Sequence, residues 1–348
     1  MAATEKSNNM DFNIPQNISP SLDFSKITNH LPRIPETLIQ SPIMNQTPKS
    51  VLILGNGFDL DLGLNTSYEN FVNSDYWPFN KSVFYDEGSL PHFLNNHLGK
   101  IGTWYDLEEV LAEFASQCIH SEDYLIEKDK AFFKTLIQSL KEYIQSQEDY
   151  FVDIMDSDIH TKRPIPAYYV LRKFLQKEIR SIYTFNYTDL YRIANKLIPG
   201  FDDDFTHIHG SLAKNNIILG TGEQRNLDDN YFEFYKSASP YYESNDLVKD
   251  LNSADEVYIF GHSLGLNDHD YFSDFFKMAS TNVHRPFHSG KLKVRIFTLD
   301  EKSEMNIKKQ LMRLTEKHLT GLYAHCDFEI LKTSNAYLAD WMCSKYNF

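Results

Sequence analysis

Two histidines, His207 and His209, flank Ile208 and stand directly before Gly210 and Ser211. An imidazole has an ordinary pKa of about 6.5, so either residue could take up a proton at neutral pH. His209 is nearest the Gly-Ser turn, and we expect it at the mouth of a cleft, with His207 buried in a sheet. The pair could also bind a metal ion, but no carboxylate or further histidine stands at a recognisable ligand spacing. We therefore expect a general base at His209 and no metal site.

Asn186 lies in the stretch 184–189, Thr-Phe-Asn-Tyr-Thr-Asp, at the end of an apolar run. Asn, Asp and Thr are frequent helix N-caps, and capping of a helix that starts near Thr188 is an adequate explanation for Thr188 and Asp189. Asn186 comes too early in the chain to be that cap. We expect its carboxamide to take part in the site.

A glycine-rich turn, Gly55-Asn56-Gly57-Phe58-Asp59, follows the apolar run Val51–Leu54. Four β-favouring residues closed by glycine predict a buried strand that turns sharply into a helix. Glycines in such a turn let backbone amides approach a phosphate, and the helix N-terminus adds partial positive charge. We expect the amides after Gly55 and Gly57 to hold a pyrophosphate.

A second glycine-bounded turn, Gly261-His262-Ser263-Leu264-Gly265, follows a further apolar run. It matches the nucleophile elbow of α/β-hydrolases, and Asp300 with His318 or His325 could complete a triad with Ser263. No oxyanion glycine loop is evident, and the first glycine turn would have no role in a hydrolase of that kind. The serine hydrolase is therefore an alternative hypothesis.

The apolar runs predict six strands: Val51–Leu54, Ser181–Phe185, Phe205–Ile208, Asn216–Leu219, Glu256–Phe260 and Lys293–Leu299. Helical spacing of apolar residues is clearest between them, at Leu107–Phe114 and Phe132–Tyr143. Strands alternating with helices predict an α/β fold, doubly wound around a mostly parallel, Rossmann-like sheet.

The domain is expected to span residues 49–348, after an irregular tail at 1–48 that is rich in Asn, Ser and Pro. Residues 67–180 contain long helices and no convincing strand, which predicts a helical insertion that caps the cleft. One of its helices should open after Asp106 as N-cap, with Glu108 and Glu109 as solvated acids of the first turn. A final helix at Tyr337–Tyr346 should pack on the sheet.

Ligands of such sheets bind beyond the carboxyl ends of the strands. The residues that follow the predicted strands should therefore converge on one crevice. They are Gly55–Asp59, Asn186–Asp189, His209–Ser211, Gly261–Leu264 and Asp300.

Composition limits the function classes. The formal charge of −14 over 348 residues argues against nucleic acid as the main ligand, because neutralising many phosphates needs a basic surface. The three cysteines are far apart, so neither a disulfide framework nor a structural zinc site is indicated. No stretch approaches the roughly 20 apolar residues of a membrane helix, and residues 1–10 lack the features of a signal peptide. We expect a cytoplasmic protein.

With these residues in hand, the chain resembles the AbiH family of bacterial abortive-infection, anti-phage proteins. The stretches that carry the resemblance run in order along most of the chain after residue 50. They are Leu54–Leu60, Thr66–Tyr68, Trp104–Glu108, Phe185–Thr188, His207–Gly210 and Gly261–Leu264.

The same stretches are similar, more distantly, to motifs of the sirtuins. Gly55, Gly57 and Gly63 repeat the spacing of the sirtuin glycines, and His209-Gly210-Ser211 resembles the catalytic His-Gly-Ser of that family. Asn65 and Tyr68 stand where sirtuins have Pro and Arg, and the four-cysteine zinc module is missing. The resemblance therefore points away from protein deacylation and toward sirtuin-like defence proteins that hydrolyse NAD.

The resemblance implies cleavage of the nicotinamide–ribose bond of NAD, with Asn186 orienting water or ribose hydroxyls and His209 as general base. Nicotinamide leaves as a neutral molecule, so no general acid is required. The residues implied in nucleotide binding are Gly55, Asn56, Gly57, Asp59, Thr66, Ser67, Tyr68, Gly210, Gly261, Ser263 and Asp300. Ser263 and Asp300 are expected at the adenosine half. A non-catalytic nucleotide sensor is an alternative, and a phage-derived trigger and self-association are expected partners.

Overall fold

The computed structural model describes residues 47–80, 82–98, 107–117, 122–156, 165–282 and 290–334. These residues belong to one unit that begins at Thr47. The expected tail up to residue 46, the predicted N-cap Asp106 and the predicted final helix Tyr337–Tyr346 lie outside the described residues.

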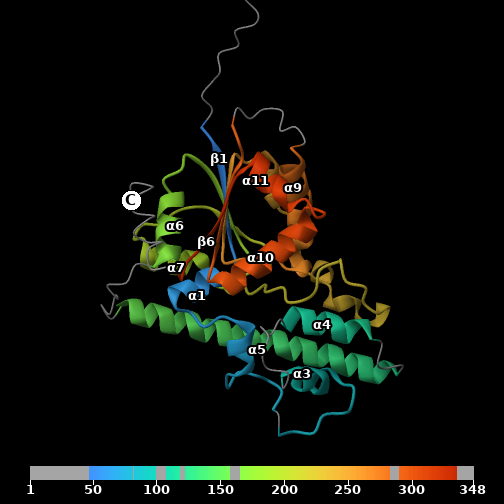
Figure 1. Ribbon diagram of the computed structural model, residues 1–348. Coiled ribbons are helices and arrows are strands. Elements are labelled where there is room, and N and C mark those ends of the chain that lie inside the picture. Colours follow the sequence, from blue (N-terminus) through green and yellow to red (C-terminus); the bar gives the residue numbers. More distant parts are fainter. Residues whose placement is uncertain are drawn as a thin grey trace, which may run out of the picture. The chain divides into compact units, whose positions relative to one another are not determined.

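A sheet of six parallel strands forms the centre of this unit (Figure 1). The strands are β1 (Lys49–Leu54), β2 (Ile179–Thr184), β3 (Phe205–His207), β4 (Glu256–Phe260), β5 (Lys293–Thr298) and β6 (Asp327–Lys332). Their spatial order is β3-β2-β1-β4-β5-β6. This is the order of a Rossmann sheet, in which the chain changes direction of winding between β1 and β4. The predicted α/β class with a mostly parallel sheet is confirmed.

One predicted strand is wrong, and one strand of the sheet was not predicted. Asn216–Leu219 is irregular, and the side chains of Ile217 and Leu219 are buried among helices instead of in the sheet. A short apolar run has the same pattern in a buried strand and in a buried loop, so the pattern alone does not distinguish them. The edge strand β6 was not predicted, since charged residues interrupt its apolar pattern.

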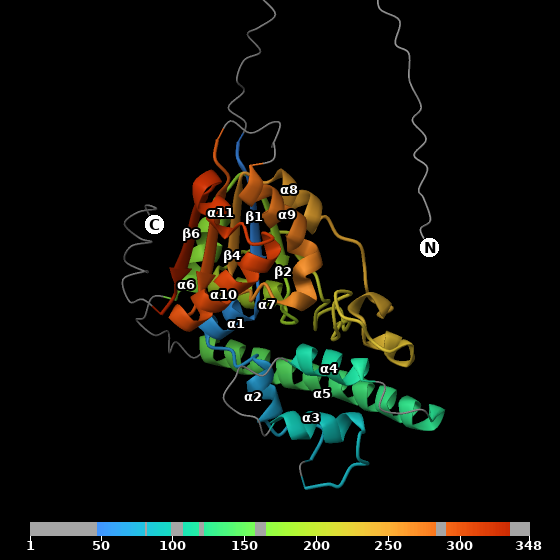
Figure 2. The same ribbon diagram turned by 45° about the vertical axis from the view of Figure 1, so that its right-hand side comes forward.

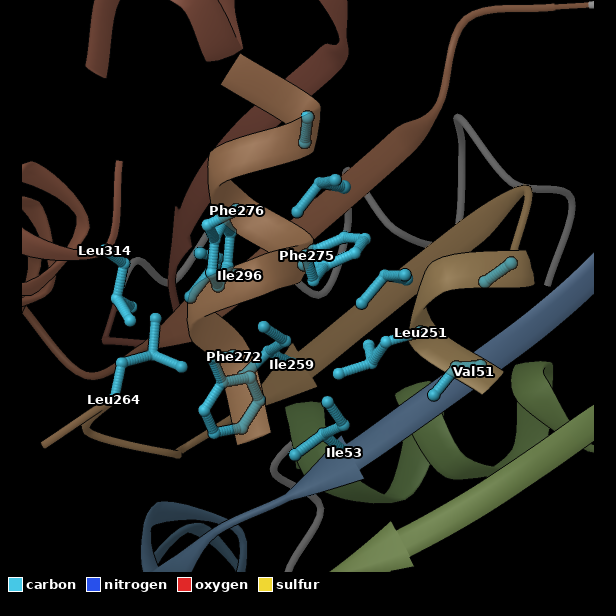
Figure 3. Close-up of a cluster of buried hydrophobic side chains, with 14 of the residues drawn as sticks. Val51, Ile53, Leu251, Ile259, Leu264, Phe272, Phe275, Phe276, Ile296 and Leu314 are labelled. Carbon is cyan, nitrogen blue, oxygen red and sulfur yellow. The ribbon is translucent and has the colours of Figure 1, made fainter. Parts of the chain in front are cut away.

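The two faces of the sheet are covered by different helices, because successive side chains of a strand point to opposite sides. Val51 and Ile53 of β1 pack with Phe272 and Leu251 on one face, as Figure 3 shows. Leu52 and its neighbours on the other face pack against a separate set of helices. The first face is covered by α8 (Leu247–Ser253), α9 (His269–Thr281), α10 (Glu301–Leu314) and α11 (Leu319–His325). The second is covered by α1 (Asn56–Leu62), α6 (Pro166–Phe174) and α7 (Leu190–Leu197).

The described residues between β1 and β2 form helices joined by irregular loops and include no strand. Besides α1 and α6 this segment contains α2 (Tyr68–Val72), α3 (Leu90–Leu98), α4 (Leu107–Ser116) and the 34-residue helix α5 (Asp123–Asp156). We call α3, α4 and α5 the helical layer. In Figures 1 and 2 it lies across the edge of the sheet at which β1 ends and α1 begins.

The helical layer has its own hydrophobic core, which includes Leu94, Leu111 and Leu136. Residues from beyond β3 complete this core, among them Ile217 and Phe234. The short helices η3 (Asp229–Phe234), η4 (Lys236–Ala238) and η5 (Leu266–Asp268) follow in that part of the chain. Helix α6, which we predicted within the insertion, packs on the sheet instead.

Candidate functional site

The two glycine turns meet at the switch point between β1 and β4. The amide of Gly55 donates to the carbonyl of Phe260 over 2.9 Å, and the amide of Gly57 donates to the carbonyl of Gly261 over 2.9 Å. A Cβ on Gly57 would lie 2.6 Å from the Cα of Gly261, which itself has a φ of +65°. The glycines therefore allow two backbone turns to touch.

This contact changes the interpretation of the first turn. The amide after Gly57 belongs to Phe58, and it donates to the carbonyl of Gly55 over 2.8 Å. The amides of Gly57 and Phe58 are thus bonded within the protein. The expectation that the amide after Gly57 holds a pyrophosphate is wrong for this conformation, because a protein carbonyl occupies that position.

Asp59 and Asn186 form the centre of one cluster. The Nδ2 of Asn186 donates to Oδ1 of Asp59 over 2.7 Å and to the carbonyl of Gly55 over 3.1 Å. The hydroxyl of Thr188 donates to the other carboxylate oxygen of Asp59 over 2.9 Å. The hydroxyl of Thr66 donates to Oδ1 of Asn56 over 2.6 Å. We call these residues, Gly55, Asn56, Asp59, Thr66, Asn186 and Thr188, the asparagine cluster.

Asp59 is only 1% exposed. Burial raises the pKa of its carboxyl from 3.8 to about 7, and the hydrogen bonds from Thr188 and Asn186 oppose this rise only in part. The nearby buried Glu148 of α5 contributes to the rise, and burial also raises the pKa of Glu148 to about 7. Glu148 accepts a hydrogen bond from the amide of Asp189. The side chain of Asp189 in turn caps α7 by accepting a hydrogen bond from the amide of Arg192. The capping explanation is therefore confirmed for Asp189, whereas Thr188 belongs to the asparagine cluster.

The carboxamide oxygen of Asn186 has no hydrogen-bond partner, although the residue is only 7% exposed. Both hydrogen bonds of the carboxamide are made by Nδ2, which fixes its orientation. A buried acceptor without a donor is uncommon in folded proteins and costs free energy. A hydroxyl or a water molecule at Oδ1 would satisfy it.

His209 belongs to a second cluster, which contains several charged side chains. Its Nε2 lies 3.2 Å from Oδ1 of Asp268, and the Nζ of Lys236 lies 3.1 Å from the same oxygen. His262 accepts the amide of Leu264 at Nδ1, so its Nε2 carries the proton and faces Oδ2 of Asp268 at 3.4 Å. Asp268 is therefore surrounded by three donors.

Lys236 and Glu108 complete this cluster. The Nζ of Lys236 lies 2.9 Å from Oε2 of Glu108 and 3.4 Å from Nε2 of His209. Tyr68 donates its hydroxyl to Glu108 over 3.1 Å. We call His209, His262, Asp268, Lys236 and Glu108 the histidine cluster.

Burial governs the electrostatics of the histidine cluster. Burial first and the charge of Lys236 second lower the pKa of His209 from 6.5 to about 4, against the opposing effect of Asp268. Burial alone would lower the pKa of Lys236, but Asp268 and Glu108 outweigh that effect and raise it. Burial alone would raise the pKa of Asp268, but Lys236 and His209 hold it well below its ordinary value.

Two expectations about the exposure of these residues are therefore wrong. His209 is 4% exposed and more buried than His207, so it does not lie at the mouth of a cleft. Its pKa of about 4 is below the ordinary 6.5, so the ring is neutral at neutral pH and a weaker base than an exposed imidazole. Glu108, expected in solvent, is 8% exposed because the polar groups of the sheet edge surround it. Glu109, in contrast, is exposed as predicted.

Other predicted site residues have mainly local roles. Ser67 caps α2 by accepting the amide of Asn70, and Asp300 caps α10 by accepting the amide of Ser303. Gly210 has a φ of +72°, and a Cβ there would lie 1.9 Å from the carbonyl of Asn216. Ser263 is exposed, next to the buried His262.

The topology separates Ser263 from both histidines of the alternative triad. Ser263 follows the carboxyl end of β4, which is five residues long and therefore roughly 16 Å from end to end. His325 lies two residues before β6 at the opposite edge, since the first residues of β4, β5 and β6 pair with one another. His318 lies beyond the far end of α10, next to α11, at that opposite edge. The serine-hydrolase triad is wrong for this fold.

The sequence did not reveal the roles of Lys236, Asp268 and Glu108. They come from η4, η5 and α4, and no spacing along the chain relates them. The one hint in the sequence is that Asp268 closely follows His262, which lies in the second glycine turn.

Within the part of the chain that the structure describes, no group of three or more His, Cys, Asp or Glu side chains is arranged to hold a metal ion. Among the described helices, none combines the length and apolar character required to cross a bilayer.

Comparison with known proteins identifies the family of the chain. A search of the curated proteins finds no match. The model of the family described as bacteriophage abortive infection AbiH matches residues 51–288, more than half of the chain. Both clusters lie within the matched range. The chain therefore belongs to the AbiH family, whose role is in abortive infection by bacteriophage.

Proposed function

We propose that this AbiH protein acts in abortive infection by hydrolysing NAD at the nicotinamide–ribose bond. The reaction would take place at the carboxyl edge of β1, β2 and β4. In sheets of this strand order, dinucleotides bind beyond the carboxyl ends of the strands at the switch point. Both clusters lie at that edge, and their residues follow β1, β2, β3 and β4.

The observation that carries the proposal is the unpartnered carboxamide oxygen of Asn186. The carboxamide is held from one side by Asp59 and Gly55, so Oδ1 remains as an acceptor of fixed orientation. A ribose hydroxyl or the attacking water supplies the donor that this oxygen lacks. Fixed acceptors of this kind orient a nucleophile without reorganisation during the reaction.

His209 receives the proton in this mechanism. The C1′–nitrogen bond breaks with its electron pair going to nicotinamide, and a water oxygen bonds to C1′ of the ribose. The water proton passes to His209, giving ADP-ribose and neutral nicotinamide. The low pKa of His209 keeps it unprotonated and able to accept at neutral pH, and Asp268, 3.2 Å from Nε2, would stabilise the imidazolium.

The charge of the histidine cluster supports a cationic transition state. Glu108 and Asp268 contribute two carboxylates, and Lys236 contributes one ammonium group. The remaining negative charge favours an oxocarbenium-like ribose, as oriented charges do in sites shielded from water.

The test is the release of nicotinamide from NAD by purified protein, measured by chromatography with and without lysate from phage-infected cells. We expect turnover in at least one condition and its loss in Asn186→Ala and His209→Ala. Asn226→Ala, at an exposed position, is the matched control and should behave as wild type. Turnover that survives both site substitutions would exclude this assignment.

A second candidate is a sensor that binds the nucleotide without cleaving it. It is favoured by the burial and low pKa of His209, which make this residue a weak base. NAD or ADP-ribose should then raise the melting temperature while no nicotinamide appears in either condition. The Asn186→Ala variant should lose this stabilisation.

A further inference from the structure

Lys236 joins two parts of the molecule that the sequence keeps far apart. Its ammonium group lies 2.9 Å from Glu108, which belongs to α4 of the helical layer. It also lies 3.1 Å from Asp268 of η5, beside the sheet.

The side chains that pair with Lys236 are buried with it. The side chains of Lys236, Glu108 and Asp268 are 6%, 11% and 13% exposed. Removing charged groups from water can cost more free energy than their mutual attraction returns. Such a buried set is therefore weak evidence for a role in stability. Its arrangement around His209 suggests a role in the site.

We infer that Lys236, held in place by Glu108 of the helical layer, is a positioning residue that sets the charge state of His209, both directly and through the Asp268 that the two groups share. The inference rests on the proposed function only for its effect on turnover. Glu108 holds Lys236 against Asp268, and the ammonium group then shares Oδ1 of Asp268 with Nε2 of His209.

The groups that face His209 come from four elements. Lys236 of η4 lies 3.4 Å from Nε2 and opposes a positive charge on the ring. Asp268 of η5 favours that charge, and His262, which follows β4, opposes it. Tyr271 of α9 has its ring centroid 6.5 Å from that of His209 and is uncharged, since burial raises its pKa. Lys236 is the nearest cation, and its removal should have the largest effect.

The experiment follows the ring signals of isotope-labelled histidine by NMR over pH, in the full chain without nucleotide. His209→Asn assigns the signal. The test variants are Lys236→Met with Glu108→Gln, which keeps the net charge of the cluster unchanged, and Glu108→Gln alone. Lys236→Arg retains the cation. The pair Lys277→Met with Glu316→Gln removes a surface ion pair of 2.8 Å and is the matched control.

We expect His209 of wild type to stay neutral from about pH 8 down to about pH 5. In the double variant its titration midpoint should rise by about 1 to 3 pH units, since a like charge within about 6 Å has been removed. Lys236→Arg, Glu108→Gln alone and the surface control should show no rise. An unchanged midpoint in a folded double variant, or a rise with Glu108→Gln alone or with Lys236→Arg, would overturn the inference.

The activity assay separates this inference from the proposed function. If the wild type hydrolyses NAD, the acid limb of the plot of kcat against pH should lie at higher pH in the double variant, and KM should stay near the wild-type value. If no protein releases nicotinamide, the proposed function fails, while the NMR midpoints still decide whether Lys236 controls His209.

Discussion

The asparagine cluster and the histidine cluster lie at the same edge of the sheet but are held together differently. In the asparagine cluster, backbone, amide and hydroxyl groups surround one carboxyl group, and every member follows β1 or β2. In the histidine cluster, one ammonium group and two imidazoles surround two carboxylates that come from α4 and η5. The first is a set of hydrogen bonds and the second is a set of buried charges.

This difference determines how each cluster should respond to change. A neutral hydrogen bond contributes about 1 kcal/mol, and loss of one partner costs about 1 to 3 kcal/mol. A buried charge deprived of its partner costs about 3 to 5 kcal/mol. The histidine cluster should therefore be the more sensitive to single substitutions. The asparagine cluster should be sensitive to pH near neutrality, because the pKa of Asp59 is about 7.

The largest effect is expected for Lys236→Met. It leaves Glu108 and Asp268 buried without their shared cation, so the free energy of unfolding should fall by about 3 to 5 kcal/mol. Adding Glu108→Gln should restore a good part of that loss, because one of the two uncompensated carboxylates is gone. Denaturant unfolding at neutral pH measures both.

The surface pair provides the contrast for this prediction. Lys277→Met should change the free energy of unfolding by at most about 1 kcal/mol, as exposed ion pairs do. A Lys236→Met protein as stable as Lys277→Met would mean that the histidine cluster is not held by its charges.

The same difference explains what could be predicted from the sequence. The asparagine cluster was largely predictable because Gly55, Asp59 and Asn186 directly follow apolar strands of a parallel sheet, which places them at one edge. The histidine cluster was not, because Lys236 and Asp268 reach the site through short helices whose positions depend on tertiary packing. His209 was found by its motif, but its burial and low pKa arise from these partners.

The apolar pattern alone also misplaced elements of the fold. Asn216–Leu219 has the composition of a strand, yet Ile217 and Leu219 complete the core of the helical layer. That core is assembled from segments on both sides of β2 and β3, and no local pattern records such an assembly. The glycines of the first turn were recognised, but their contact with Gly261 depends on the position of β4.

The second prediction concerns the pH dependence that Asp59 confers. Its pKa is about 7 in the folded protein and 3.8 ordinarily, so between these values the folded state retains a proton that the unfolded chain has released. Stability contributed by this group is therefore present at low pH and is lost as pH rises toward 7. Asn at position 59 can accept from Asn186 and donate to Thr188 without titrating.

The free energy of unfolding of Asp59→Asn minus that of wild type should accordingly be about 2 to 4 kcal/mol larger at pH 8 than at pH 5. Urea unfolding at the two pH values gives the difference. Asp204→Asn, at an exposed position, should leave the pH dependence as in wild type. A constant difference between Asp59→Asn and wild type at both pH values would exclude a proton on Asp59.

The third prediction tests the contact between the two glycine turns. In Gly57→Ala the new Cβ meets the backbone of Gly261 at 2.6 Å, where no flexible side chain can yield. Overpacking of this kind should cost roughly 1 to 3 kcal/mol. Gly290→Ala has no atom within 4 Å of its new Cβ and should stay within about 0.5 kcal/mol of wild type. Equal melting temperatures for the two variants would show that the turns can separate at little cost.

The smallest effect is expected for Ser263→Ala, at the exposed position that directly follows His262 but contributes to neither cluster. Its free energy of unfolding should stay within about 0.5 kcal/mol of wild type. A fluorophosphonate probe should not label Ser263, because His318 and His325 lie at the opposite edge of the sheet. If Ser263 bonds the nucleotide as an ordinary hydroxyl, its loss should weaken NAD binding by about 1 kcal/mol, or roughly fivefold in Kd. Calorimetric titration measures that change, and labelling that disappears in the variant would instead require a base that approaches Ser263 from another part of the chain.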